Sequence, residues 1–168
     1  SHSYGLKFAA LRYFNAAGYD MNGEIIGLEK EPQNLLPIVM EVIMGERAHL
    51  NIFGNDYNTN DGTCERDYIH VSDLASAHLL SEKKLADSQE NFIINLATGK
   101  KYSVLEVVNG CKSFLSEYVN HKFVDRRLGD PELLYSESKL AFEKLGWKPQ
   151  FSNLESILKS MYDVYKVN

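Results

Sequence analysis

Residues 92–96, Phe92-Ile93-Ile94-Asn95-Leu96, form a nearly continuous apolar run in this chain of 168 residues. Such a run is typical of a parallel β-strand that is covered on both faces. Residues 8–14, FAALRYF, are also apolar and rich in residues that favour strands, and they predict a second, mostly buried strand. The two segments together predict a parallel sheet.

Helical patterns alternate with strand patterns along the rest of the chain. Helices are expected at 35–45, 73–85, 103–118, 138–145 and 153–165, and further strands at 50–53, 66–71 and 122–124. Asn34 is expected to cap the first helix, and Ser103 and Glu106 are spaced as a capping box. This alternation is typical of the α/β class. Residues 16–33, rich in glycine, predict a long loop of the kind that tends to carry function.

The composition excludes several classes of protein. A formal net charge of −5 argues against general nucleic-acid binding. No apolar run reaches the roughly 18–20 residues of a membrane span. Two distant cysteines, Cys64 and Cys111, give neither a disulfide framework nor a zinc site, so a cytoplasmic setting is expected.

A dinucleotide-binding fingerprint is missing from these residues. An α/β chain that binds a dinucleotide should carry G-x-G-x-x-G after its first strand, because only glycine lets the backbone approach the pyrophosphate. None of the 11 glycines makes that pattern. Either the protein needs no dinucleotide, or the relevant unit precedes Ser1; the absence of a starting methionine suggests a chain cut from a longer one.

Two arginines stand beside glycine turns and aspartates. Arg66 follows Gly62 and precedes Asp67, and Arg127 lies in the segment RRLGD. Guanidinium groups match phosphate oxygens with two parallel hydrogen bonds and stay charged at any working pH. A surface ion pair with a nearby aspartate is the alternative for each of them.

Four motifs resemble UDP-glucose 4-epimerases, which belong to the extended short-chain dehydrogenase/reductase superfamily. They are LRYFNAAG at 11–18, IFGNDYNTNDGTCERDYIHV at 52–71, RRLGDP at 126–131 and LGWKP at 145–149. The resemblance runs from about residue 5 to 165, and the long central motif is its most specific part.

The resemblance implies that residues 1–168 are the carboxy-terminal, UDP-sugar-binding portion of such an enzyme. Residues 6–15 and 91–118 would be elements of a Rossmann domain that is otherwise missing from the chain. In the family, that domain holds NAD and the catalytic tyrosine and lysine, and the sugar is oxidised at C4 to a 4-keto intermediate and then reduced on its other face. Residues 1–168 are expected to hold the UDP-hexose and to be inactive alone, and the full-length enzyme is expected to be a homodimer.

Individual site residues are carried over by position. Tyr13 and Phe14 would contact both NAD and substrate, and the other expected substrate-binding residues are Asn15, Gln33, Asn34, Leu35, Asn51, Ile52, Phe53, Arg66, Arg127, Leu128, Gly129, Asp130 and Leu134. Simpler roles remain open for some of them. Phe14 and Phe53 could be core aromatics, Asn34 only a helix cap, and Asp130 a turn residue.

Three other signals are expected to carry no chemistry. Tyr135 and Lys139 have the Y-x-x-x-K spacing of the superfamily's catalytic pair, but they follow the RRLGDP turn, and Lys139 is expected on a helix surface. His70 and His78 are expected to be structural rather than metal ligands, with His78 facing inward from its helix. Cys64 is expected to be a small buried residue.

The resemblance leaves the exact substrate open. Leu134 stands where some family members have tyrosine and others a smaller residue, and that side chain limits the room for an N-acetyl group. UDP-N-acetylhexosamine is therefore an alternative substrate, and UDP-xylose and UDP-glucuronate are further alternatives. A UDP-sugar-binding module or a pseudoenzyme remnant is the alternative from another class of protein.

Overall fold

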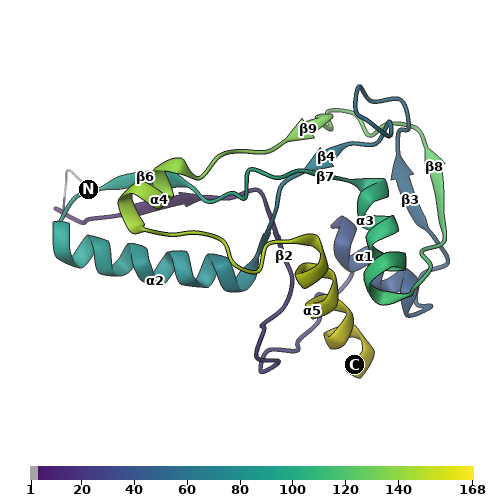
Figure 1. Cartoon of the computed structure of the whole chain (residues 1–168), viewed down its shortest axis with the longest axis horizontal. Helices are drawn as coiled ribbons and strands as arrows, with labels where there is room; N and C mark the ends of the chain where they lie inside the picture. Colours follow the sequence, from purple (N-terminus) through teal and green to yellow (C-terminus); the bar gives the residue numbers. More distant parts are fainter. Residues whose placement is uncertain (1–3) are drawn as a thin grey trace.

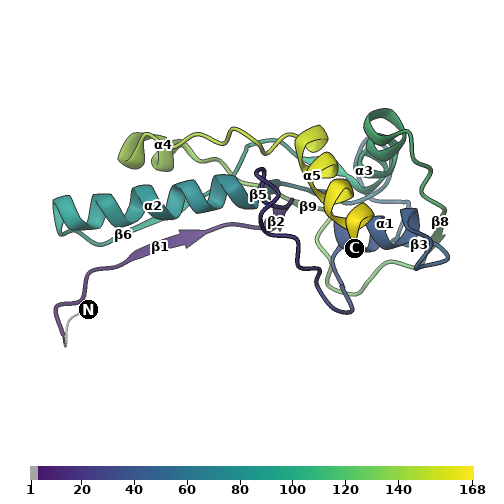
Figure 2. The same ribbon diagram turned by 90° about the horizontal axis from the view of Figure 1, so that it is seen from below.

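The apolar run at 92–96 forms strand β6 (Phe92–Asn95), which pairs in parallel with β1 (Ala9–Arg12), as predicted. The computed structural model describes residues 4–168 and has an α/β fold. Figure 2 shows α2 (Val71–Ser88) and α4 (Lys139–Leu145) on one side of this strand pair. Their apolar side chains form one hydrophobic core with the strands, which includes Trp147.

The expectation that β6 is covered on both faces is wrong for the described residues. Phe92 and Ile94 are buried under the helices, but Ile93 points the other way and is 53% exposed. Strand β1 is likewise only partly buried. The reason is that, within residues 4–168, β1 pairs with β6 alone and both helices pack on the same face.

A second and larger core lies at the other end of the elongated molecule (Figure 1). It is built by α1 (Leu35–Ile43), α3 (Val104–Gly110) and α5 (Leu154–Val167). The parallel pair of β3 (Leu50–Phe53) and β8 (His121–Val124) lies beside them. A π-helical turn at Cys111–Leu115 continues α3, so the regular helix ends earlier than predicted.

Two small sheets connect the cores. Strand β2 (Asn15–Ala17) pairs in parallel with β5 (Tyr68–His70). Strand β4 (Glu65–Arg66) lies between β7 (Tyr102–Ser103) and β9 (Leu133–Leu134).

The strand predicted at 66–71 is in fact two strands, because Asp67 turns the chain from one sheet to the next. Its buried carboxylate accepts hydrogen bonds from the backbone N–H groups of Thr98 and Gly99 and from the Thr98 hydroxyl. Burial raises the pKa of Asp67 above its usual value, although the hydrogen bonds from Thr98 and Gly99 act to lower it. All three residues of β5 are buried.

Some predicted helix details are confirmed and others are wrong. The Ser103–Glu106 capping box is present, and α4 ends at Leu145 as expected, with Gly146 as its cap. Asn34 stands at the amino terminus of α1, but its side chain makes no capping hydrogen bond. His78 was expected to face inward and is exposed. Within residues 4–168 no helix is long and apolar enough to cross a bilayer.

His70 links β5 to the last helix from a fully buried position. Its backbone N–H donates to the Ser152 hydroxyl at 2.8 Å, and its Nδ1 accepts from the Ser72 N–H at 3.1 Å. Its Nε2 lies 3.2 Å from the Ser160 hydroxyl. Because Nδ1 is an acceptor, the neutral ring fits this site and the imidazolium does not. Burial lowers the pKa of His70 below 6.5, although the charge of Asp73 acts in the other direction.

Acid is therefore expected to destabilise the fold through His70. The unfolded chain binds the proton more readily, so this residue's contribution is complete above pH 6.5 and is lost as the pH falls through the lower pKa of the folded state. Urea unfolding at pH 7.5 and at pH 5.5 measures the loss. A His70→Asn variant should show a smaller pH dependence, and an equal dependence in both proteins would contradict the assignment.

Candidate functional site

A cavity of about 520 Å³ lies between the amino terminus of α1, strand β3 and the connection from β8 to β9. Most of the predicted site residues line it: Phe14, Asn15, Gln33, Asn34, Leu35, Asn51, Ile52, Phe53, Arg66, Arg127 and Asp130. The fold therefore brings five segments that are far apart in the sequence to one cavity. Their roles toward a ligand stay predictions.

Four predicted residues lie outside the cavity lining. Tyr13 packs edge-on against His78, with ring centroids 6.4 Å apart. Leu128 is fully exposed, and Gly129 forms the turn beside it with φ of 79°. Leu134 is the direct neighbour of Arg66 in the β4–β9 ladder.

Arg66 reaches the cavity from β4 and is held in place by oxygen atoms. One NH group donates to the backbone carbonyl of Glu65 at 2.8 Å, and another pairs with the Asp130 carboxylate. The Arg66 side chain is 11% exposed, so little water competes with these bonds. The ion pair with an aspartate that the sequence left open is thus present, and it lies in the cavity wall.

Arg127 reaches the same cavity from the segment after β8. Its guanidinium carbon lies 4.3 Å from the centroid of the Phe53 ring, within cation–π distance. Within residues 4–168 Arg127 forms no ion pair, so its charge is available to a ligand. Arg66 and Arg127 therefore share one hollow, which is the arrangement that two phosphate-binding arginines require.

The amino terminus of α1 faces the cavity between these charged groups and the long loop. Asn34, Leu35 and Leu36 line the wall there. The first N–H groups of a helix have no partner within the helix, and the helix dipole favours an anion at this end.

Asn15 and Phe14 close the cavity on the side of β1. The Asn15 amide nitrogen donates to the backbone carbonyl of Asp67 at 2.8 Å, which fixes the side chain. Phe14 is 39% exposed and lines the cavity. A flat, apolar ring in the wall of a cavity suits stacking against a planar ligand group.

Several lining residues were missed by the sequence analysis: Tyr19, Glu29, Cys64, Tyr68 and Met161. Burial raises the pKa of the Cys64 thiol and of the Tyr68 hydroxyl, so both groups stay protonated near neutral pH. Cys64 is therefore no ready nucleophile, in line with its expected role. Tyr68 could have been found, because it closely follows Arg66 in the long central motif.

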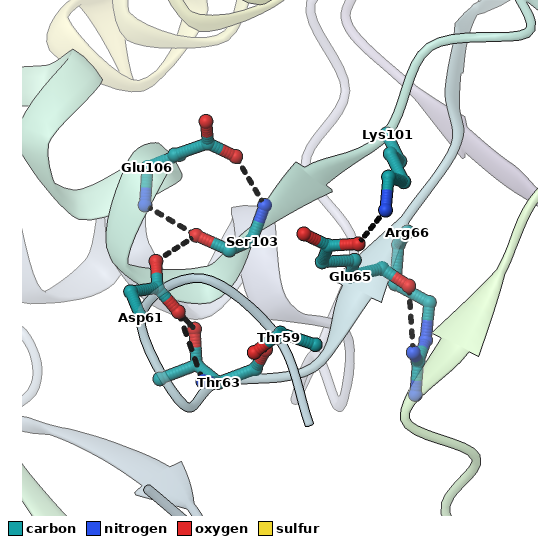
Figure 3. Close-up of polar contacts among 8 residues, drawn as sticks. All are labelled: Thr59, Asp61, Thr63, Glu65, Arg66, Lys101, Ser103 and Glu106. Carbon is teal, nitrogen blue, oxygen red and sulfur yellow. Dashed lines mark hydrogen bonds and ion pairs between the residues drawn. The ribbon is translucent and has the colours of Figure 1, made fainter. Parts of the chain in front are cut away.

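Hydrogen bonds fasten the segment before Arg66 to helix α3, as Figure 3 shows. The Asp61 carboxylate accepts from the backbone and hydroxyl of Thr63 at 2.9 and 2.7 Å, and from the Ser103 hydroxyl that caps α3. Lys101 pairs with Glu65 at 2.5 Å. These contacts give the polypeptide around Arg66 a fixed position on the larger core.

Two signals from the sequence remain, namely the Y-x-x-x-K spacing of Tyr135 and Lys139 and the pair of histidines, His70 and His78. Lys139 is exposed and pairs with Glu143 at 3.8 Å on the surface of α4. No cluster of histidine, cysteine and carboxylate side chains suited to a metal ion is found among the described residues.

The chain is similar to curated and solved UDP-glucose 4-epimerases. The enzyme of Halalkalibacterium halodurans is 42% identical over 165 residues, which cover 98% of this chain and 49% of that relative. The crystal structure of the enzyme from Brucella ovis in complex with NAD has a TM-score of 0.93 at 40% identity, covering 98% of this chain and 50% of that one. The enzyme from Bifidobacterium longum in complex with NAD⁺ and UDP has a TM-score of 0.83 at 33% identity, covering 98% and 49%.

A family model described as GDP-mannose 4,6 dehydratase matches residues 1–161, so the fold and the match define a member of the extended short-chain dehydrogenases/reductases. More specifically, the chain belongs to the UDP-glucose 4-epimerase family, as its motifs predicted. It spans about half the length of the curated relatives it matches. Homologous structures were solved with bound NAD, the cofactor that the sequence predicted.

Proposed function

We propose that this chain holds the UDP part of a UDP-hexose for an enzyme that interconverts UDP-glucose and UDP-galactose. The observation that carries the proposal is the convergence of Arg66 and Arg127 on one cavity. The two guanidinium groups and the free N–H groups of α1 would bind the diphosphate. Asn51, Ile52 and Phe53 would flank the uracil, and Asp130 would accept a hydrogen bond from the ribose.

The proposed reaction explains why the strongest binding contacts would be made to the nucleotide and not to the sugar. A 4-epimerase must present both faces of the sugar at C4, so the hexose has to turn while the diphosphate stays bound. Strong charge-assisted bonds to phosphate provide an anchor that does not depend on the orientation of the sugar. Asn15, which lines the cavity with its amide fixed by Asp67, would bond the sugar.

Two residues of this chain, Tyr13 and Phe14, would supply a part of the contacts to NAD. Phe14 lines the cavity and would lie against the nicotinamide. Tyr13 is 44% exposed, packs against His78, and would reach both NAD and the substrate. NAD, when bound, supplies the group that takes and returns the hydride. On this proposal the proton-transferring tyrosine and lysine and most of the NAD contacts come from outside residues 1–168.

We further propose that residues 1–168 are the carboxy-terminal portion, with 6–15 and 91–118 belonging to a Rossmann domain. The open face of the β1–β6 pair, where Ile93 is exposed, supports this placement because such a face in a parallel sheet is normally covered. The parent enzyme would be a homodimer, and this portion alone would be inactive. A gene whose upstream frame lacks a glycine-rich fingerprint and Y-x-x-x-K would favour a UDP-sugar-binding module instead.

Titration of the chain with UDP in a calorimeter tests whether it binds UDP. An NADH-coupled assay of the full-length protein with UDP-galactose tests the reaction. Saturable UDP binding and turnover support the proposal. Binding without turnover in the full-length protein would favour a binding module. Absence of UDP binding would remove the proposal.

Leu134 is expected to set how large a sugar substituent is accepted. Exchanging it for tyrosine in the full-length protein should lower kcat/KM for UDP-N-acetylglucosamine by about tenfold, the usual scale for a steric change in a pocket, and leave UDP-glucose turnover nearly unchanged. Leu133→Tyr is the matched control, because neighbouring residues of a strand point to opposite faces. Equal effects of both variants on both substrates would contradict this role.

A further inference from the structure

Arg126 and Arg127 are adjacent, yet the structure uses them differently. Arg127 lines the cavity, and Arg126 turns away from it toward the loop of residues 54–62. The Arg126 Nε donates to the Asp56 carboxylate at 2.6 Å, and a second nitrogen donates to the Asp56 backbone carbonyl. The guanidinium carbon of Arg126 also lies 4.1 Å from the centroid of the Tyr57 ring. Arg126 is thus bound to this loop at three points.

The loop itself is closely packed, so it can act as a fixed support. The Tyr57 N–H donates to the Gly62 carbonyl at 2.9 Å. A Cβ atom on Gly62 would lie 2.2 Å from the Asn55 carbonyl oxygen, and Gly62 has a φ of 79° that other residues rarely adopt. A Cβ atom on Gly54 would lie 2.7 Å from the Arg126 Cγ. Gly62 is therefore required by close approach of the backbone, and Gly54 by close approach of the Arg126 and Tyr57 side chains.

The far end of the loop is joined to the larger core. Asp61 bonds to Thr63 and to Ser103, the residue that caps α3 (Figure 3). The near end is joined to β8, because the Gly54 N–H donates to the Val124 carbonyl at 2.9 Å. Residues 54–62 are therefore anchored at both ends, next to the point where β8 leads into Arg126.

We infer that Asp56 and Arg126 are a positioning pair that holds Arg127 ready for the diphosphate. The inference rests on the proposed function, since it assigns Arg127 to the phosphates. The pair fixes the backbone at Arg126, and the stacking of Arg127 on Phe53 fixes the guanidinium at the other end. An arginine held in its binding position before the ligand arrives loses less conformational freedom on binding, so UDP binds more tightly.

The exposure of the Asp56–Arg126 pair allows an effect on UDP binding to be measured separately from an effect on stability. The Asp56 and Arg126 side chains are both exposed, and exposed ion pairs contribute little to stability. Asp56→Asn should therefore weaken UDP binding by about fivefold, a coupling of ordinary size between contacting groups, with no change in melting temperature. Asp56→Glu, which keeps the charge, should recover part of the affinity.

A double-mutant cycle with UDP as the titrant tests the inference. If Asp56 acts through Arg127, Asp56→Asn should cause no further loss of UDP affinity in an Arg127→Ala background. Glu143→Gln, which removes the exposed Lys139–Glu143 pair on α4, is the matched control and should change nothing.

Three results would overturn the inference, and the last differs from the first two in what it removes. An equal loss of affinity from Asp56→Asn with and without Arg127, or no loss at all, removes the positioning role and leaves the proposed function intact. A wild-type chain that does not bind UDP removes the proposed function and the positioning role together.

Discussion

Replacing Arg127 or Arg66 with alanine is expected to weaken UDP binding by about 2–4 kcal/mol, the scale for removing one partner of a charge-assisted pair. Both guanidinium groups line the same cavity, and each would lose its hydrogen bonds to phosphate. Calorimetric titration with UDP measures the change. Arg47→Ala is the control, because Arg47 forms an ion pair with Glu41 instead of lining the cavity.

The two variants should differ in stability. Arg66 is almost buried and pairs with Asp130, so its removal leaves a carboxylate without its partner and should lower the melting temperature. Arg127 is stacked on Phe53 and should be removable at little cost. Unchanged UDP affinity in both variants would refute the diphosphate assignment.

The second large effect is expected at Asp73, in the first turn of α2. Asp73 is 2% exposed, and its carboxylate accepts from the N–H groups of Gln150 and Phe151 at 2.8 and 2.9 Å and from the Ser152 hydroxyl at 2.5 Å. Asp73→Ala leaves these buried donors unpaired and should lower the free energy of unfolding by about 3 kcal/mol or more. Urea denaturation at pH 7.5 measures it.

Asp87→Ala is the matched control for this stability change. Asp87 lies on the same helix but is exposed, so its removal should change the free energy of unfolding by less than about 0.5 kcal/mol. Similar losses in both variants would show that helix α2, and not the bonds of Asp73 to residues 150–152, is responsible.

The motifs predicted the cavity better than the local patterns predicted the strands. Arg66 and Arg127 are far apart in the chain, and periodicity alone cannot bring them together. The family resemblance did so, because the motifs at 52–71 and 126–131 belong to one known site. Periodicity placed β3, β8, α4 and α5 closely, since each has a clear apolar pattern and a recognisable end.

The errors in the prediction have physical causes. The break at Asp67 is fixed by hydrogen bonds to Thr98 and Gly99, which are distant in sequence and invisible to a local pattern. The two-residue strands β7 and β9 are too short to show alternation. The apolar sequence at 92–96 predicts that Ile93 is buried. Burial of Ile93 depends, however, on which elements pack on its face of the sheet, and a local sequence pattern does not contain that information.

Only Tyr13 and Phe14 separate β1 from β2, although these strands belong to different sheets and β2 contributes Ala17 to the larger core. Three Cα–Cα steps join Arg12 to Asn15 and span at most about 11 Å, so the covalent chain itself limits how far the β1–β6 pair can move from the larger core. Phe14 lies in this short tether and in the cavity wall at once. A shift of the β1–β6 pair relative to the larger core would therefore displace Phe14 in the cavity wall.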